Sequence, residues 1–99
     1  MHARITTLQS TPDQIPEVQH YLQDTILPVL RLQPGFKRLV VMRDADDKVV
    51  TITFWATEAD EQATFAREYL RDVLNDKATL LLHSSRSETY QVLLASDAA

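Results

Sequence analysis

The sequence contains no cysteine among its 99 residues and only one glycine, Gly35. Without cysteine the chain has no disulfides, no thiolate nucleophile and no cysteine-ligated metal. Loops that cradle phosphate groups need several glycines, because the backbone must approach the phosphate closely. Nucleotide-dependent chemistry built on a Rossmann or P-loop site is therefore excluded.

Positive charge and long apolar runs are also scarce. The formal net charge is −4, which argues against nucleic-acid binding because that affinity rests on clustered Lys and Arg displacing counterions. No stretch approaches the roughly 20 apolar residues that a bilayer span needs. The first residues also lack the apolar region of a signal peptide. We therefore expect no nucleic-acid partner, no membrane association and a cytoplasmic location.

The polar residues do not form a metal motif. His2, His20 and His83 are far apart, with no His-x-His or His-x-x-x-His pair. The segment 44–47 resembles the start of an EF-hand loop, but it lacks the required glycine and has Trp55 at the twelfth position. We expect no metal site and no cofactor.

The residues that are present predict one domain over 1–99. A composition of 44% hydrophobic and 24% charged residues is that of an ordinary globular protein. Hydrophobic patterns and turn residues predict strands at 2–8, 36–43, 48–56 and 89–94, with one helix before Pro34 and another after Thr57. The order βαββαβ predicts an α+β, ferredoxin-like fold, in which a four-stranded antiparallel sheet carries two helices on one face.

Prolines complicate the first helix. Thr11 as N-cap, followed by Pro12, predicts a start at this point, whereas Pro16 favours a start one turn later. Pro28 lies inside the helical pattern, where it removes a hydrogen bond and should kink or loosen the helix. The predicted apolar stripe comprises Ile15, Val18, Leu22, Ile26 and Val29.

Thr57 is the predicted cap of the second helix. Three acidic residues in its first turn, Glu58, Asp60 and Glu61, suit the helix dipole. The predicted buried stripe comprises Ala59, Ala63, Ala66, Leu70 and Val73 or Leu74, with Phe65 and Tyr69 on its flank.

The third strand is apolar or neutral on both of its faces. One set of alternate residues contains Val50, Ile52 and Phe54, and the other ends at Thr53 and Trp55. A face exposed to solvent would normally carry charge. A second copy of the chain would cover the face opposite the helices, so we expect a homodimer whose sheets pack together.

Several short motifs occur together along nearly the whole chain. They are a Thr-rich first strand, the helix end 26–31, the turn 33–36, the strand end Phe54-Trp55 and the acidic helix start 58–60. This combination resembles the antibiotic-biosynthesis-monooxygenase-like family of dimeric α+β barrels. The resemblance implies a dimeric α+β barrel, in a family that includes cofactor-free oxygenases of aromatic phenols, quinol monooxygenases and haem-degrading enzymes.

The haem-degrading branch fits poorly. The resemblance would require a His late in the second helix, an Asn on the first strand and a Trp in that helix. Residues 67–77 contain no His, and the other two positions also lack the required residue types. A cofactor-free oxygenase needs only an apolar pocket, a group near the acidic proton and donors for the developing oxyanion.

Trp55 is the first candidate site residue that the resemblance indicates. In the oxygenase interpretation it stacks on an aromatic substrate between sheet and helices, and Thr51 and Thr53 supply hydroxyl groups. The alternative is a core or interface tryptophan whose N–H binds an acceptor. Threonine is also an ordinary strand former, so Thr51 and Thr53 carry little weight alone.

Tyr21, His20 and Tyr69 are the candidate catalytic residues. A histidine facing a pocket would be a natural general base, but His20 lies off the apolar stripe, which favours a surface position. Tyr21 lies beside the stripe and can donate to an oxyanion, and Tyr69 flanks the second helix.

The sequence thus predicts a cofactor-independent monooxygenase-like protein that acts on a small aromatic or quinol-type molecule. The alternative is a homodimer of the same fold that binds a small apolar or aromatic ligand without transforming it, or that serves only a structural role. A titratable group inside a cavity would favour the enzyme over the protein that only binds its ligand.

Overall fold

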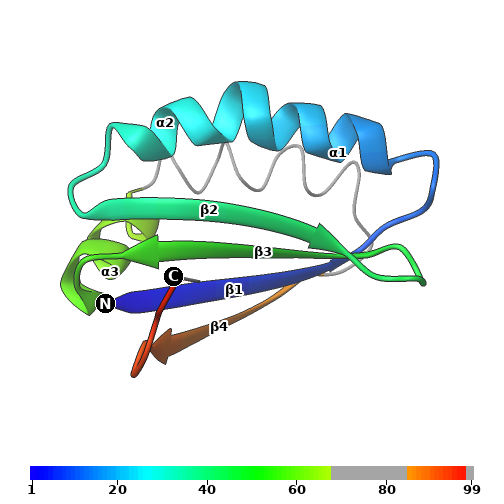
Figure 1. The fold of residues 1–99 in the computed structure, drawn as a ribbon. Coiled ribbons are helices and arrows are strands. Elements are labelled where there is room, and N and C mark those ends of the chain that lie inside the picture. The colour runs from blue at the N-terminus through cyan, green and yellow to red at the C-terminus, as the bar shows by residue number, and fades with distance from the viewer. Residues whose placement is uncertain (68–84, 98–99) are drawn as a thin grey trace.

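The computed structural model describes residues 1–67 and 85–97. One antiparallel sheet, ordered β2-β3-β1-β4, contains β1 (His2–Gln9), β2 (Phe36–Arg43), β3 (Lys48–Trp55) and β4 (Ser85–Gln91). A continuous helical segment before β2 comprises α1 (Ile15–Tyr21), η1 (Leu22–Ile26) and α2 (Leu27–Arg31), and α3 (Glu58–Phe65) follows β3. The helices lie on one face of the sheet (Figure 1). The predicted ferredoxin-like α+β fold is confirmed.

The first helix begins at Ile15, one turn after Thr11. The preceding residues form a turn in which the Gln14 N–H donates to the Thr11 carbonyl at 3.0 Å. Pro16 occupies the first helical turn, where its missing N–H leaves no bond unmade. The later of the two predicted starts is therefore the one observed.

Pro28 is preceded by a wider turn. The five residues of η1 form a π-helix immediately before α2, and Pro28 lies in the first turn of α2. Because Pro28 has no N–H for the helical ladder, a wider turn ahead of it accommodates the missing bond. The predicted local loosening at Pro28 is confirmed. The wider turn also shifts the apolar stripe, so that Leu30 is buried while Val29 is only half-buried.

Two groups of apolar side chains form the core between helices and sheet. Leu8, Val18 and Val49 pack together under α1. Ile26, Leu30 and Trp55 form the second group under α2, toward α3. In the described part of the chain, no helix is long and apolar enough to cross a membrane.

The orientation of α3 differs from the predicted one. Ala59, Ala63 and Ala66 are exposed, whereas Glu61 and Thr64 are buried. The predicted alanine stripe is therefore wrong at these three positions. The Thr57 Oγ accepts a hydrogen bond from the Asp60 N–H at 3.1 Å, which confirms the predicted cap. The remaining predicted stripe residues, Leu70, Val73 and Leu74, lie outside the described residues.

The fourth strand lies earlier in the chain than the predicted range 89–94. It ends at Gln91, opposite His2, because β1 offers no further ladder partners beyond that point. One last bond follows, from the Val92 N–H to the Met1 carbonyl at 2.9 Å. Leu93 and Leu94 follow the end of the strand and are largely exposed.

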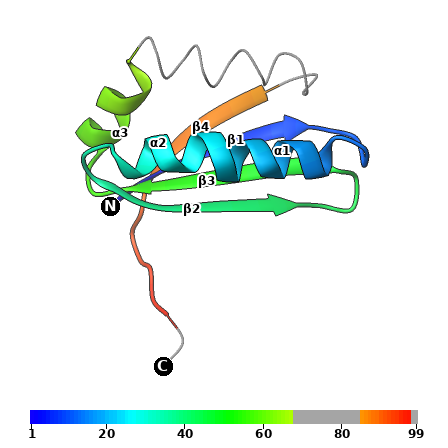
Figure 2. The same cartoon turned by 90° about the horizontal axis from the view of Figure 1, so that it is seen from above.

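Strand register assigns each side chain to a face. Trp55 pairs with His2 and Phe36, and this row faces the helices. The opposite face carries cross-strand rows of mainly apolar residues: Arg38-Phe54-Ala3, Val40-Ile52-Ile5 and Met42-Val50-Thr7. No helix among the described residues covers this face (Figures 1 and 2). The two-faced apolar character predicted for the third strand is confirmed.

Gly35 connects α2 to β2 in a conformation that other residues rarely adopt. Its φ is +80°, and an added Cβ would collide with the Asp60 side chain. We expect Gly35→Ala to cost about 1–2 kcal/mol from the backbone alone, plus the displacement of Asp60. A lower urea midpoint with an unchanged m-value would show this. Gly35→Asn tolerates positive φ but has the same Cβ, so recovery of stability in that variant would contradict the collision.

Asp44 organises the β2–β3 turn. Its Oδ1 accepts hydrogen bonds from the N–H groups of Lys48 and Asp46, each at 2.9 Å. The bond from Lys48 is the main cause that lowers the pKa of Asp44. Since the folded pKa lies below the unfolded one, this carboxylate stabilises the fold above the unfolded pKa, and the gain disappears as pH falls through the folded pKa. NMR titration of the Asp44 carboxyl carbon should give a midpoint below 3.8, and a midpoint at or above that value would contradict the prediction.

Candidate functional site

Trp55 is the centre of an aromatic cluster beneath the helices. Its side chain is 0% exposed. The Phe36 and Phe65 rings meet it edge-on, with centroids 5.4 and 5.8 Å away. The indole N–H donates to the Thr53 Oγ at 3.0 Å. We call Trp55, Phe36 and Phe65 the aromatic cluster, and its edge-to-face geometry is the favourable one for aromatic rings.

A charged pair lies directly beside this cluster. The Arg4 Nη1 donates to the Glu61 Oε1 at 3.0 Å, and the Glu61 side chain is only 2% exposed while that of Arg4 is 28% exposed. The Arg4 guanidinium also lies 4.2 Å from the centroid of the Phe65 ring. The arginine is thus fixed by a carboxylate on one side and an aromatic face on another.

The structure brings some of the predicted site residues together. Tyr21 is half-buried and packs against the group that contains Trp55. Thr53 is the acceptor for the Trp55 N–H, and Thr51 is half-buried two residues earlier, on the same face of β3. This hydrogen bond ties Thr53 to Trp55.

Two other predicted residues do not join this group. The His20 side chain is 75% exposed, and its Nδ1 lies 3.9 Å from the Asp24 carboxylate on the outer side of the helix. The structure thus places His20 on the surface, as its position off the apolar stripe indicated. Tyr69 lies outside the described residues and stays a prediction.

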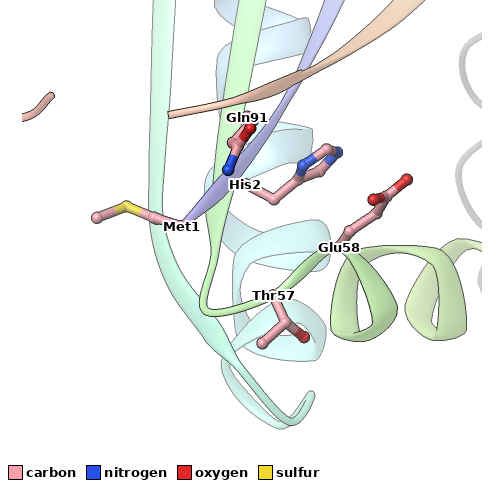
Figure 3. Close-up of a pocket in the computed structure, with 5 residues that line it drawn as sticks. All are labelled: Met1, His2, Thr57, Glu58 and Gln91. Atoms are coloured by element: carbon pink, nitrogen blue, oxygen red, sulfur yellow. The ribbon is translucent and has the colours of Figure 1, made fainter. Parts of the chain in front are cut away.

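A pocket of about 260 Å³ opens at the start of β1, next to the first turn of α3. Its lining residues are Met1, His2, Thr57, Glu58 and Gln91, and we call it the His2 pocket. His2 is 8% exposed, and its buried Nε2 has no hydrogen-bond partner among residues 1–67 and 85–97. The His2 ring and the Glu58 side chain extend to the same side (Figure 3). The Gln62 Nε2 donates a hydrogen bond to the Glu58 Oε1 at 3.0 Å.

Sequence reasoning missed Arg4, Glu61 and His2. All three acidic residues in the first turn of α3 suit the helix dipole, so the sequence does not distinguish Glu61 from its two neighbours. Strand alternation was the signal available for the other two, since His2, Arg4 and Leu8 fall on one face of β1. Among residues 1–67 and 85–97 there is no group of three or more His, Asp or Glu side chains that could hold a metal ion.

The fold and this site define a class: a small ferredoxin-like α+β protein with an aromatic cluster and a buried charged pair between sheet and helices. The family model described as antibiotic biosynthesis monooxygenase matches residues 1–75. The chain therefore belongs to the antibiotic biosynthesis monooxygenase family. A search of curated proteins finds no match.

Solved structures with the same fold include proteins of different activities. The monooxygenase ActVA-Orf6 of Streptomyces coelicolor, in complex with nanaomycin D, has a TM-score of 0.83 at 14% identity, over 99% of this chain and 92% of that one. SnoaB, a cofactor-independent oxygenase from Streptomyces nogalater, has a TM-score of 0.77 at 14% identity, covering 95% and 94%. The heme-degrader MhuD from Mycobacterium tuberculosis, with two hemes bound, has a TM-score of 0.80 at 14% identity, covering 98% and 100%. At these identities the similarity establishes the fold, and the activity must be argued from the residues.

Proposed function

We propose that this chain is a cofactor-independent monooxygenase that acts on a small aromatic or quinol-type molecule. The observation that carries the proposal is membership of the antibiotic biosynthesis monooxygenase family over residues 1–75. With an anthrone-type substrate a ring CH₂ becomes C=O, so that one oxygen atom of O₂ enters the product and the other leaves as water with the two hydrogens. With a quinol-type substrate a ring C–H becomes C–OH and the quinol is oxidised to a quinone, and the second oxygen atom leaves as water with the two hydroxyl hydrogens. The substrate itself supplies the electrons once it has lost a proton.

The proposed site lies where β1 and β3 meet α3. It comprises Trp55 with its hydrogen-bond acceptor Thr53, and Tyr21, which packs against the group that contains Trp55. The Arg4–Glu61 pair contributes charge. A water-poor apolar region beside a fixed cation is the environment in which a developing oxyanion is most strongly stabilised. This arrangement favours Tyr21 over His20 as the catalytic candidate, and Tyr69 remains a further one.

Oxygen uptake tests the proposal. The purified protein with a chelator present should consume oxygen with anthrone- or quinol-type substrates several-fold faster than buffer alone. Catalase should return no oxygen, because monooxygenation yields water rather than peroxide. A rate equal to that of the uncatalysed reaction would contradict the proposal.

One observation favours the alternative of a ligand-binding or structural homodimer. Trp55 is 0% exposed and its N–H is already bonded to Thr53, so in this conformation it presents no free surface for stacking. Binding of quinol-type molecules without oxygen uptake would identify a binder, and the absence of both would identify a structural domain.

We also propose that the chain acts as a homodimer through the face opposite the helices. The apolar rows through Phe54, Ile52 and Val50 lie there, and Met42 and Tyr90 are each 47% exposed. Exposed apolar patches of this kind mark association sites. Sedimentation at micromolar concentration should give a dimer, and Ile52→Glu should convert it to monomer. A well-folded wild-type monomer would contradict this prediction.

A further inference from the structure

Positive charge is concentrated on one segment of this acidic chain. Between Asp24 and Asp44 the sequence contains no Asp or Glu, although the chain as a whole has a formal net charge of −4. The same segment holds four of the ten Lys and Arg residues, namely Arg31, Lys37, Arg38 and Arg43. The first of them ends α2, and the other three belong to β2. We call these four residues the basic edge.

β2 is an edge strand, and its outer side has no strand beside it among residues 1–67 and 85–97. In the sheet order β2-β3-β1-β4 it pairs with β3 alone, and Figure 2 shows it as the outermost strand on the side away from β4. A bulge at Lys37 interrupts the pairing near its start, whereas from Arg38 to Arg43 the register with β3 is continuous. An edge strand of this kind presents N–H and C=O groups with which another extended chain can pair.

The side chains of the basic edge lack counter-ions in the described part of the fold. All four are exposed to solvent. None of them forms an ion pair or a side-chain hydrogen bond with another described residue, whereas Arg4 and Lys48 each have a carboxylate partner. These four charges are therefore not needed to neutralise acidic groups within the described fold, and they are available to a partner.

Charge and apolar surface occur together on both sides of β2. On the face opposite the helices, Arg38 is followed at alternate positions by Val40 and Met42, and Met42 is 47% exposed. On the helix-bearing side Val41, which is 40% exposed, precedes Arg43 at the next alternate position. An extended peptide alternates its own side chains between the same two sides. A strand that carries both acidic and aliphatic side chains would therefore complement β2.

The basic edge is too short to suit a long polyanion. The acidic turn Asp44, Asp46 and Asp47 follows immediately after β2 and ends the run of positive charge. Nucleic-acid binding needs many phosphate contacts from clustered Lys and Arg, and the net charge of the chain opposes it at long range. A short acidic strand fits this surface better, because it can end before the acidic turn.

We propose that the outer edge of β2 is a docking site for an extended acidic peptide segment of a partner protein, which adds to the sheet as a further strand. Main-chain hydrogen bonds to β2 hold the backbone of this segment, and the basic edge selects its acidic side chains. The surface differs from the rows on β3 and β1 to which we assign the homodimer. It is also separate from the aromatic cluster, so the inference does not rest on the proposed enzymatic activity.

The first experiment measures the binding of a defined probe by fluorescence anisotropy. The probe is a fluorescein-labelled peptide with blocked ends that alternates glutamate with valine, and the matched control carries glutamine in place of glutamate. The glutamate peptide should bind about tenfold tighter at low ionic strength, and added salt should reduce this difference. Equal affinity of the two peptides, or no binding of either, would overturn the proposal. A single-stranded oligonucleotide of equal charge that binds as tightly would also overturn it.

A second measurement tests the pairing of strands. Binding of the glutamate peptide should slow hydrogen exchange of backbone amides within residues 38–43. The same peptide N-methylated at every amide keeps its charges but cannot donate main-chain hydrogen bonds, so it should bind about tenfold weaker. Equal binding of the methylated peptide, or NMR shifts confined to residues remote from β2, would contradict strand addition.

Substitutions then assign the site to the basic edge. Lys37→Gln and Arg38→Gln each remove one exposed charge and should retain the fold, while the affinity for the glutamate peptide should fall about two- to fivefold for each. The matched control Arg67→Gln removes an exposed arginine just beyond α3 and should leave the affinity unchanged. An equal loss in Arg67→Gln would attribute the attraction to net charge and overturn the assignment. Self-association of the double variant, together with a wild type that binds no peptide, would show that the charges only protect the edge.

Sedimentation with saturating peptide separates this site from the homodimer interface. The protein should keep its oligomeric state and gain only the mass of the bound peptide. Conversion of a dimer to monomer would place the peptide on the face opposite the helices and contradict docking at the edge. A monomer that binds the peptide along β2 would contradict the homodimer and leave the docking site established.

Discussion

Arg4→Met should destabilise the protein far more than Glu61→Gln does, although the two substitutions break the same ion pair. The Glu61 side chain is 2% exposed, so removing Arg4 leaves a buried carboxylate without a charged partner. Breaking a buried pair in this way costs about 3–5 kcal/mol. The Arg4 side chain is 28% exposed, and in Glu61→Gln it keeps both solvent and an amide acceptor. We expect about 1–2 kcal/mol for that variant, the cost of weakening one charged hydrogen bond.

The double variant Arg4→Met with Glu61→Leu completes the cycle. Replacing both members of a buried pair by apolar residues of similar volume is often neutral or stabilising. The double variant should therefore unfold near the wild-type urea midpoint, and the cycle should give a large coupling energy. All four proteins must be compared at one concentration, because a dimer gains apparent stability with concentration.

A different result would change the description of the site. If both single variants cost less than about 1 kcal/mol, the pair would behave as a surface salt bridge screened by water. Arg4 would then be mobile rather than fixed, and its proposed role in binding an oxyanion would lose its structural basis. Equal and large costs for both variants would indicate that Arg4 is as fully desolvated as Glu61.

The order of helices and strands along the chain could be predicted from the sequence because it depends on local patterns. The turn at Pro34-Gly35, the β2–β3 connection at 44–47 and the Thr57 cap are all encoded within a few residues. Pro28 predicted the irregular turn for the same reason. These features need no knowledge of what packs against them.

The inward side of α3 could not be predicted in this way. Ala59 and Ala63 form an apolar stripe, yet the helix buries Glu61 and Thr64. Glu61 faces inward because Arg4, 57 residues earlier in the chain, neutralises it. An apolar stripe predicts the buried side of a helix only when the surface on which the helix packs is also apolar. Here α3 packs on β1, which presents the charged side chain of Arg4. The candidate site depends on this long-range charge pairing, which explains why the sequence did not indicate Arg4.

Trp55→Ala should be the most destabilising single substitution in the second group of the core. Trp55 is fully buried between Phe36, Phe65, Ile26 and Leu30. Large-to-small changes at such positions cost about 3–5 kcal/mol, a large share of the about 5–15 kcal/mol that stabilises a typical domain. Because Trp55 is the only tryptophan, unfolding of the wild type can be followed by its fluorescence. Unfolding of variants that lack Trp55 must be followed by circular dichroism.

Milder variants separate the packing role of Trp55 from a catalytic one. Thr53→Val leaves the buried indole N–H without an acceptor, which should cost about 1–3 kcal/mol. Trp55→Phe with Thr53→Val removes donor and acceptor together, so adding Thr53→Val to Trp55→Phe should cost much less than it does in the wild type.

If Trp55 only packs the core, Trp55→Phe should retain oxygen uptake in proportion to the folded fraction. If Trp55 stacks on the substrate after a rearrangement, KM should rise in that variant while the fold remains intact, and quinol-type ligands should quench the wild-type fluorescence. Unchanged fluorescence together with an unchanged KM would assign Trp55 to the core alone.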